Sequence, residues 1–384
     1  MSEHPLIPLV RQALHSVEDP EIHRPITELG MVDEIHADDS GAVHVKVLLT
    51  VSGCPMRSEI TSRVEEALAQ VEGVTSSTVE LGVMTDEQRT AMRQMLRGGQ
   101  PEREIPFAQP GNLTKVIGVA SGKGGVGKSS VTVNLAVALA KMGRNVGILD
   151  ADIYGHSVPD LLALGDARPT VVDDMILPVP ALENIRVISM GMLKQSRDQV
   201  VAWRGPILDR ALTQLLSDVF WGDLDYLLLD LPPGTGDVAM SLGQKIPGSE
   251  ILVVTTPQQA ASEIAERAGS MAHIMEQRII GVVENMAWLE HTCPSCDETH
   301  RIELFGAGGG ALVAEGLTDR VGYKVEQLVQ VPFDEALLAG GDRGTPIVDS
   351  APDHPAAKAL VELAETIASR KPSIVGQRLN LLTN

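Results

Sequence analysis

The stretch VIGVASGKGGVGKSSVTVNLAVALA, residues 116–140, has the pattern of a strand, a loop and a helix in succession. It begins with a short apolar run typical of a buried strand, continues as a glycine-rich loop and ends with apolar residues at helical spacing. Gly122, Gly127, Lys128 and Ser129 occupy the fixed positions of the pattern G-x-x-x-x-G-K-[ST]. Because a strand precedes this pattern and a helix follows it, we interpret it as more than a chance match.

The loop predicts a site for the phosphates of a nucleotide. Glycines let consecutive backbone N–H groups turn toward a phosphate chain, and the following helix presents its positive end to the same anion. We expect Lys128 to contact the β- and γ-phosphates and the Ser129 hydroxyl to bind Mg²⁺. The alternative is a glycine-rich turn that closes a βα unit and leaves Lys128 in solvent. Lys123 is unusual, because a simple phosphate cradle does not require it.

Length and composition predict a globular protein of two or three domains, since the chain has 384 residues and is 43% hydrophobic. The beginning of the chain lacks a basic stretch followed by a long apolar segment, so we expect a soluble, cytoplasmic protein. Three cysteines do not suggest a disulfide framework.

The net charge is −20, and only 3% of the residues are aromatic. So acidic a surface repels the phosphate backbone of nucleic acids, and few aromatic rings are available to stack on bases. We therefore expect neither nucleic acid nor an anionic membrane as the main partner.

Residues 1–97 read as a small α+β domain. Helical spacing covers 5–17, 56–70 and 85–96, whereas 43–51 and 74–81 read as strands. The segment 98–112, GGQPEREIPFAQPGN, is rich in glycine, proline and charge and is interpreted as a linker. A larger domain is expected over 113–370, followed by a C-terminal tail, 371–384.

The small domain contains one cysteine of interest, in SGCPMRSEI. Pro55 suits the first position of a helix, which places Cys54 at the N-cap, where the helix dipole favours ionisation of a thiol. The alternative is a small capping residue without chemistry.

In the larger domain, apolar strands alternate with helical segments. The expected strands cover 116–121, 145–150, 185–190, 226–231, 250–256, 279–286 and 324–333. Several are continuously apolar, as in parallel strands covered on both faces. We therefore predict a doubly wound α/β domain with a mostly parallel sheet, whose ligands lie beyond the carboxyl ends of its strands.

Aspartates follow two of these strands. Asp150 and Asp152 stand where the strand in ILDADIYGHS ends, and Asp230 ends the strand in DYLLLDLPPGTGD. Mg²⁺ takes oxygen ligands, often through water, so these positions suit a magnesium site. The alternative is that they cap helices or begin turns.

A second chemical centre is HTCPSCDETH, residues 291–300. The spacing of Cys293 and Cys296 allows both thiolates to bind one soft metal, but the pair supplies only half of a four-thiolate site. Three completions remain open. A two-fold dimer brings two such pairs together, or His291 or His300 helps to complete a zinc site within the chain, or the pair is a redox dithiol.

The chain resembles the Mrp-type (ApbC-like) iron-sulfur cluster carrier ATPases, which are deviant Walker A P-loop NTPases. The resemblance covers about residues 113–350, and residues 1–97 resemble a small domain related to iron-sulfur assembly factors. The motifs that carry it stand in the family's order: SGKGGVGKSS, ILDADIYGHS, WRGP (203–206), DYLLLDLPPGTGD, GVVENMAW (281–288) and CPSC.

The resemblance implies roles for individual residues. Lys123 is similar to the signature lysine that reaches the partner's nucleotide in an ATP-sandwich dimer, and Asp152 to the residue that orients the attacking water. The implied catalytic residues are Lys123, Lys128 and Asp152, and the implied magnesium residues are Ser129, Asp150 and Asp230. The implied nucleotide contacts are Gly122, Lys123, Gly124, Gly125, Val126, Gly127, Lys128, Ser129, Ser130 and, at the adenine, Asn285.

For the cysteines, the resemblance implies that Cys293 and Cys296, with their dimer mates, hold a bridging [4Fe-4S] cluster, and it favours this over zinc within one chain. Cys54 is similar to an accessory cysteine whose part is open. The implied function is a homodimeric carrier that uses ATP and Mg²⁺, hydrolyses ATP slowly and passes the cluster to apo-proteins, in contact with cluster assembly factors.

Two alternative functions follow from related families. A ParA/MinD-like positioning ATPase shares the signature lysine but needs a basic face or a basic amphipathic C-terminal helix. The tail KPSIVGQRLNLLTN has only Lys371 and Arg378 as basic residues, which disfavours this alternative. A reductase similar to the nitrogenase iron protein needs a cluster that cycles between redox states, and the sequence leaves that possibility open.

Overall fold

The structure, a computed structural model, describes residues 4–20, 22, 24–50, 56–96, 103–152, 155, 157–172, 175–193, 205–234, 237–258, 270–271 and 273–370. The chain divides into two compact units, residues 1–102 and 103–384. The predictions for Cys54, for Trp203 and Arg204 and for the tail 371–384 concern residues outside the described set.

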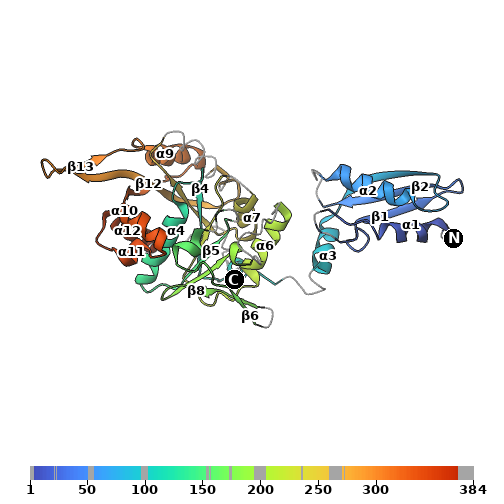
Figure 1. Ribbon diagram of the computed structural model, residues 1–384, viewed down its shortest axis with the longest axis horizontal. Helices are drawn as coiled ribbons and strands as arrows, with labels where there is room; N and C mark the ends of the chain where they lie inside the picture. Colours follow the sequence, from blue (N-terminus) through green and yellow to red (C-terminus); the bar gives the residue numbers. More distant parts are fainter. Residues whose placement is uncertain are drawn as a thin grey trace, which may run out of the picture. The chain divides into compact units, whose positions relative to one another are not determined.

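The first unit is a three-stranded sheet with helices packed on it, which confirms the predicted α+β domain (Figure 1). β2 pairs antiparallel with β1 and parallel with β3. Along β2, Val43, Val45 and Val47 alternate with more exposed residues and face a core that includes Leu14 and Leu68. The elements are α1 (Leu6–Leu14), β1 (Val32–Ala37), β2 (Ala42–Leu49), α2 (Arg57–Ala69), β3 (Ser76–Val83) and α3 (Asp86–Leu96).

Strand β1 is absent from the sequence prediction. Its residues, VDEIHA, include two acidic side chains and none of them is fully buried, so the apolar signal of an edge strand is weak.

The second unit is built on a nine-stranded sheet in the order β13-β12-β11-β4-β10-β5-β9-β8, with β14 paired to β12. Strands β4, β5, β9, β10, β11, β12 and β14 are joined by parallel pairs, which confirms the predicted mostly parallel sheet. Their bounds are β4 (Lys115–Ser121), β5 (Val146–Asp150), β9 (Ile185–Ser189), β10 (Tyr226–Asp230), β11 (Glu250–Thr255), β12 (Arg278–Thr292) and β14 (Gln327–Phe333). The antiparallel strands are β8 (Val179–Pro180) and β13 (Thr299–Ile302).

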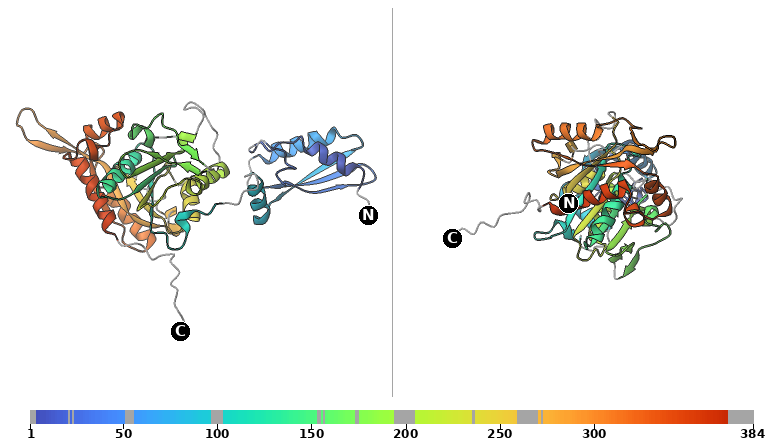
Figure 2. Two further views of the ribbon diagram at one scale, coloured as in Figure 1. Left: turned by 90° about the horizontal axis from the view of Figure 1, so that it is seen from below. Right: turned by 90° about the vertical axis from the view of Figure 1, so that its left-hand side faces the viewer.

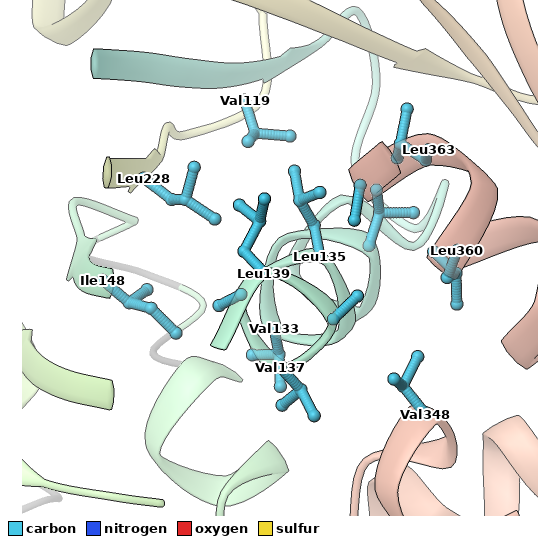
Figure 3. Close-up of a cluster of buried hydrophobic side chains, with 14 of the residues drawn as sticks. Val119, Val133, Leu135, Val137, Leu139, Ile148, Leu228, Val348, Leu360 and Leu363 are labelled. Atoms are coloured by element: carbon cyan, nitrogen blue, oxygen red, sulfur yellow. The ribbon is translucent and has the colours of Figure 1, made fainter. Parts of the chain in front are cut away.

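Helices cover both faces of this sheet, as a doubly wound fold requires (Figures 1 and 2). On one face, α4 and α12 pack against each other and against the sheet. Figure 3 shows Leu135 and Leu139 of α4 close to Leu228 of β10. The elements on this side are α4 (Lys128–Lys141), α5 (Ser157–Leu161), α10 (Glu335–Arg343), α11 (Ile347–Ser350) and α12 (Pro355–Ser369).

The second face is covered by α6 (Gly205–Ser217), α7 (Asp237–Lys245) and α9 (Gly309–Val321). Smaller elements are η1 (Pro106–Ala108), η2 (Met190–Leu193) and a separate hairpin of β6 (Thr170–Val172) and β7 (Met175–Leu177). Among the described residues, no helix is long and apolar enough to cross a membrane.

The main difference from the expected strands concerns β12. The apolar run predicts a strand over 279–286, but the strand extends to Thr292 and pairs with β13 as an antiparallel hairpin. The hairpin projects beyond the rest of the sheet (Figures 1 and 2). Its outer part is exposed and polar, so it lacks the apolar signal by which buried strands are recognised.

Candidate functional site

The glycine-rich loop lies between β4 and α4, at the carboxyl edge of the sheet. Gly125 and Gly127 have φ of +80° and +81°, a left-handed conformation that favours glycine. A β-carbon on Gly127 would also collide with the side-chain amide of Asn285. Two hydrogen bonds fix the start of the loop: the Ser121 hydroxyl donates to the Lys123 carbonyl at 3.0 Å, and the Gly234 N–H donates to the Ser121 carbonyl at 2.8 Å.

The Asp230 carboxylate, at the end of β10, collects the polar side chains that follow the loop. It accepts hydrogen bonds from Lys128 Nζ at 2.6 Å and from the Ser129 hydroxyl at 2.6 Å. A third comes from the Thr132 hydroxyl at 3.1 Å. Lys128 is 6% exposed and Asp230 is fully buried, so this ion pair is shielded from solvent.

A second buried carboxylate lies beside the first. Asp150 ends β5 and stands opposite Asp230 in the parallel register of β5 and β10. Burial, together with the neighbouring Asp230 carboxylate, raises the pKa of Asp150 to about 7, although a hydrogen bond from Ser189 opposes the shift. Lys128 is therefore one ammonium near two buried carboxyl groups.

This donor set fits a magnesium ion. The Ser129 hydroxyl and the Asp150 and Asp230 carboxylates are hard oxygen ligands of the kind that Mg²⁺ takes. A divalent cation would compensate the negative charge that Lys128 alone leaves uncompensated when Asp150 ionises. The structure thus gathers the three magnesium residues that the sequence predicts.

The two predicted catalytic residues outside this group lie nearer to solvent. Asp152 is half-buried; its N–H donates to Asp150 at 3.1 Å, and its carboxylate accepts a hydrogen bond from the Gly155 N–H at 3.0 Å. Lys123 is also half-buried, and within the described part of the chain its ammonium has neither a hydrogen bond nor an ion pair. The reach that the resemblance implies for Lys123 stays a prediction.

Asn285, on β12, joins the loop from the other side. Its side-chain N–H donates to the Val126 carbonyl at 2.9 Å, whereas its side-chain oxygen is buried without a hydrogen-bond partner among the described residues. An unpaired buried acceptor is costly unless a ligand supplies the donor. Asn285 lines a cavity, and an adenine amino group is a donor of the required kind.

This cavity has a volume of about 870 Å³ and begins at the loop, where Gly127 and Ser130 line it. Its size suits a nucleoside. Part of its wall follows β14 and continues into α10: Pro332, Phe333, Asp334, Leu337, Gly341 and Arg343. The sequence prediction missed this wall. The signal that could have found it is the position of Pro332 and Phe333 at the carboxyl end of a predicted parallel strand.

Cys293 and Cys296 lie in the turn between β12 and β13. The Cys293 carbonyl accepts the Asp297 N–H at 2.9 Å, and Asp297 has a left-handed φ of +57°, which closes the turn tightly. Backbone N–H groups of Ser295 and Cys296, together with the Cys296 thiol, donate to Cys293 Sγ and lower the pKa of that thiol. Cys293 is partly exposed and Cys296 is exposed, so the pair lies at the surface of the chain.

The predicted residues therefore form two groups. The loop residues, Asp150, Asp152, Asp230 and Asn285 gather at the carboxyl edge of the sheet, whereas the cysteines lie at the tip of the hairpin. Strand β12 connects them, because it carries Asn285 and leads directly to Cys293, a span of at most roughly 27 Å of extended chain.

Comparison with known proteins identifies relatives of both units. Residues 112–368 match the family model of the NUBPL iron-transfer P-loop NTPases, and residues 9–81 match that of an iron-sulfur cluster assembly protein. An iron-sulfur cluster carrier protein of Mycobacterium tuberculosis is 55% identical over 372 residues, which cover 97% of this chain and 96% of the relative.

A second curated relative has the same name at lower identity. An iron-sulfur cluster carrier protein of Deinococcus radiodurans is 40% identical over 360 residues, 94% of each chain. Among solved structures, a nucleotide-binding protein of Archaeoglobus fulgidus in complex with ADP is 38% identical. The match covers 60% of this chain and 86% of the Archaeoglobus chain, with a TM-score of 0.49.

Proposed function

Since the chain belongs to the NUBPL iron-transfer P-loop NTPases, we propose that it is an ATP-dependent carrier that holds a [4Fe-4S] cluster between two copies of itself and transfers the cluster to apo-proteins. One observation carries this proposal. A single strand, β12, contributes Asn285 to the nucleotide cavity and leads to the cysteine pair eight residues later, at Cys293.

The nucleotide step begins with an exchange of partners. Lys128, which donates to Asp230 in this structure, turns to the β- and γ-phosphates of ATP. Ser129 and Asp230, with Asp150 beside them, would hold Mg²⁺, which neutralises charge on the phosphates. Asp152 orients water for a slow hydrolysis, and Lys123 reaches the nucleotide of a second copy. The Asn285 side-chain oxygen accepts the adenine amino group.

The cluster is the cargo of the carrier. Cys293 and Cys296 supply two of the four thiolates that a [4Fe-4S] cluster needs, and a second copy supplies the others. The exposed position of the pair supports this use, because both a second copy and an acceptor protein have access to it. The preceding small unit, which matches an iron-sulfur assembly family, fits contact with assembly factors or acceptors.

The charge of the chain bears on its surroundings. A net charge of −20 opposes binding to nucleic acid or anionic membranes. Three cysteines, an odd number that does not suggest a disulfide framework, suit the reducing cytoplasm, where we place the protein.

A transfer assay tests the proposal. The reconstituted chain is mixed anaerobically with an apo-ferredoxin, and the acceptor's cluster content is measured with and without Mg·ATP. We expect the acceptor to gain cluster as the carrier loses it. Reduction of an acceptor by a cluster that stays on the chain would instead establish a reductase. Sedimentation of the chain with DNA or anionic liposomes in ATP, without cluster transfer, would establish a positioning ATPase.

A further inference from the structure

The tip of the β12–β13 hairpin has two chemically different faces. Residues directly opposite in an antiparallel pair share a face, and so do residues two apart along a strand. His291 pairs with His300, and the Cys293 N–H donates to the Glu298 carbonyl at 2.9 Å, which places these two residues opposite each other as well. All four therefore lie on one face, and each carries a side chain that can bind a metal.

The opposite face carries no soft ligand. There, the hydroxyls of Thr292 and Thr299 lie 3.0 Å apart and share a hydrogen bond. Next to them, Glu290 and Arg301 form an ion pair with 3.6 Å between Oε1 and Nε. The metal-binding side chains are thus sorted onto one side of the hairpin.

Two residues of this face, Glu298 and His300, lie close to Cys296 in the turn. Ligand atoms of Cys296, Glu298 and His300 lie within 4.8 Å of one another, and His300 Nε2 is 3.9 Å from Glu298 Oε2. The Cys296 thiol donates to Cys293 Sγ, which therefore adjoins this group without being one of its three clustered atoms. Two thiols, an imidazole and a carboxylate make up four ligands from one chain.

We propose that each chain by itself binds one divalent metal ion of the zinc or iron(II) class at this tip, through Cys293, Cys296, His300 and Glu298. Sulfur and nitrogen ligands with one carboxylate suit the tetrahedral preference of such ions. Both thiols bind as thiolates, so any proton that they carry leaves when the metal ion binds. Metal binding at this tip does not depend on the proposed cluster transfer, whereas its competition with a shared cluster rests on the proposed function.

A single metal ion and the shared cluster therefore compete for the two thiolates. A metal ion held by Cys293 and Cys296 of one chain removes them from a cluster shared by two chains. The single-ion site therefore keeps the pair occupied in a separate chain, and the shared cluster requires its release.

The test is a titration of the full-length, metal-free, reduced chain with Co²⁺ under anaerobic conditions. Tetrahedral Co²⁺ gives strong visible absorption and a sulfur-to-cobalt charge-transfer band. We expect saturation at one Co²⁺ per chain. His300→Ala should lower the affinity on the order of 100-fold, and Glu298→Gln by a smaller factor.

The chain offers a matched control. Glu34 and His36 on β1 have the same spacing, with His36 Nε2 3.3 Å from Glu34 Oε2, but none of the cysteines whose positions the structure describes is in that unit. His36→Ala should leave the Co²⁺ titration unchanged.

The inference is wrong if wild type binds one Co²⁺ per two chains and His300→Ala binds it equally well, because the ion is then held by four thiolates. Cluster assembly by wild type and by His300→Ala tests the cluster proposal separately. His300→Ala should still assemble a cluster like wild type, whereas failure of wild type to assemble any cluster contradicts the cluster proposal and leaves the Co²⁺ result standing.

Discussion

Lys128 Nζ lies 2.6 Å from a carboxylate oxygen of Asp230, and both side chains are buried beneath the phosphate-binding loop. The lysine expected to bind phosphate is thus already paired with a carboxylate expected to support Mg²⁺. When a nucleotide binds with Mg²⁺, its phosphates must replace Asp230 as the partner of Lys128, and Mg²⁺ must replace Lys128 as the partner of Asp230. The pair therefore affects both the stability of the nucleotide-free chain and its affinity for ATP.

Replacing Lys128 should affect both properties. In Lys128→Ala, Asp230 keeps its buried carboxylate without the ammonium, so we expect the free energy of unfolding to fall by about 3–5 kcal/mol. ATP binding should be lost as well. Denaturant unfolding and equilibrium binding measure the two effects. The double variant Lys128→Met, Asp230→Asn should recover most of the stability but no ATP binding; if it stays as unstable as Lys128→Ala, the buried pair is not the cause.

Lys123 provides the contrasting case. Its ammonium has no ion pair within the described residues, so Lys123→Ala should leave the free energy of unfolding nearly unchanged. Because the lysine is expected to act on a second copy's nucleotide, the variant should bind ATP and lose hydrolysis. Affinity and turnover are measured on the same preparation. An equal loss of ATP binding in Lys123→Ala and Lys128→Ala would contradict the role across the dimer.

Asp150 makes stability depend on pH in a specific direction. Its pKa is raised from 3.8 to about 7, so the stabilisation is complete below pH 3.8 and is lost as pH rises through about 7. This contribution is on the order of 4 kcal/mol. Asp150→Asn lacks this carboxyl group, so position 150 should not contribute to any loss of stability between pH 3.8 and about 7. Unfolding at pH 5 and pH 8 measures the difference, and identical pH dependence in both proteins would contradict the shift.

Magnesium binding should depend on the same proton. Mg²⁺ requires the carboxylate, so the affinity for Mg·ADP should rise between about pH 6 and pH 8 in wild type. Calorimetric titration at several pH values measures this, and a flat profile would show that Asp150 does not take part.

Asn285 should select the base. Its side-chain oxygen, which has no hydrogen-bond partner among the described residues, is proposed to accept an amino group, which adenine has at position 6 and hypoxanthine lacks. Wild type should therefore bind ATP about 10-fold more tightly than inosine triphosphate, and Asn285→Ala should bind both alike. Competition binding measures the ratio. Equal affinities in wild type would place the base elsewhere.

Much of the second unit can be predicted from the sequence, because strands buried on both faces appear as continuous apolar runs, as in residues 226–231. The phosphate loop is also local, so its pattern is sufficient to place Gly127 and Lys128. Strands β1 and β13 escaped prediction because exposed, charged strands lack that apolar signal.

Sequence patterns do not predict contacts between segments that are far apart in the sequence. No local pattern states that Asp230 holds Lys128, about a hundred positions earlier, or that Asp150 faces Asp230. Their meeting depends on β10 lying between β4 and β5, a strand order that individual motifs do not encode. The sorting of Glu298 and His300 onto the cysteine face likewise depends on hairpin register.

Whether two chains share one cluster is measured by the iron and sulfide content of the anaerobically reconstituted protein, together with its mass in solution. We expect a dimer with two iron and two sulfide ions per chain, because a [4Fe-4S] cluster is divided between two chains. Cys293→Ala and Cys296→Ala should each abolish the cluster. A full cluster on a monomer, or an intact cluster in both cysteine variants, would show that the cluster is not shared through these cysteines.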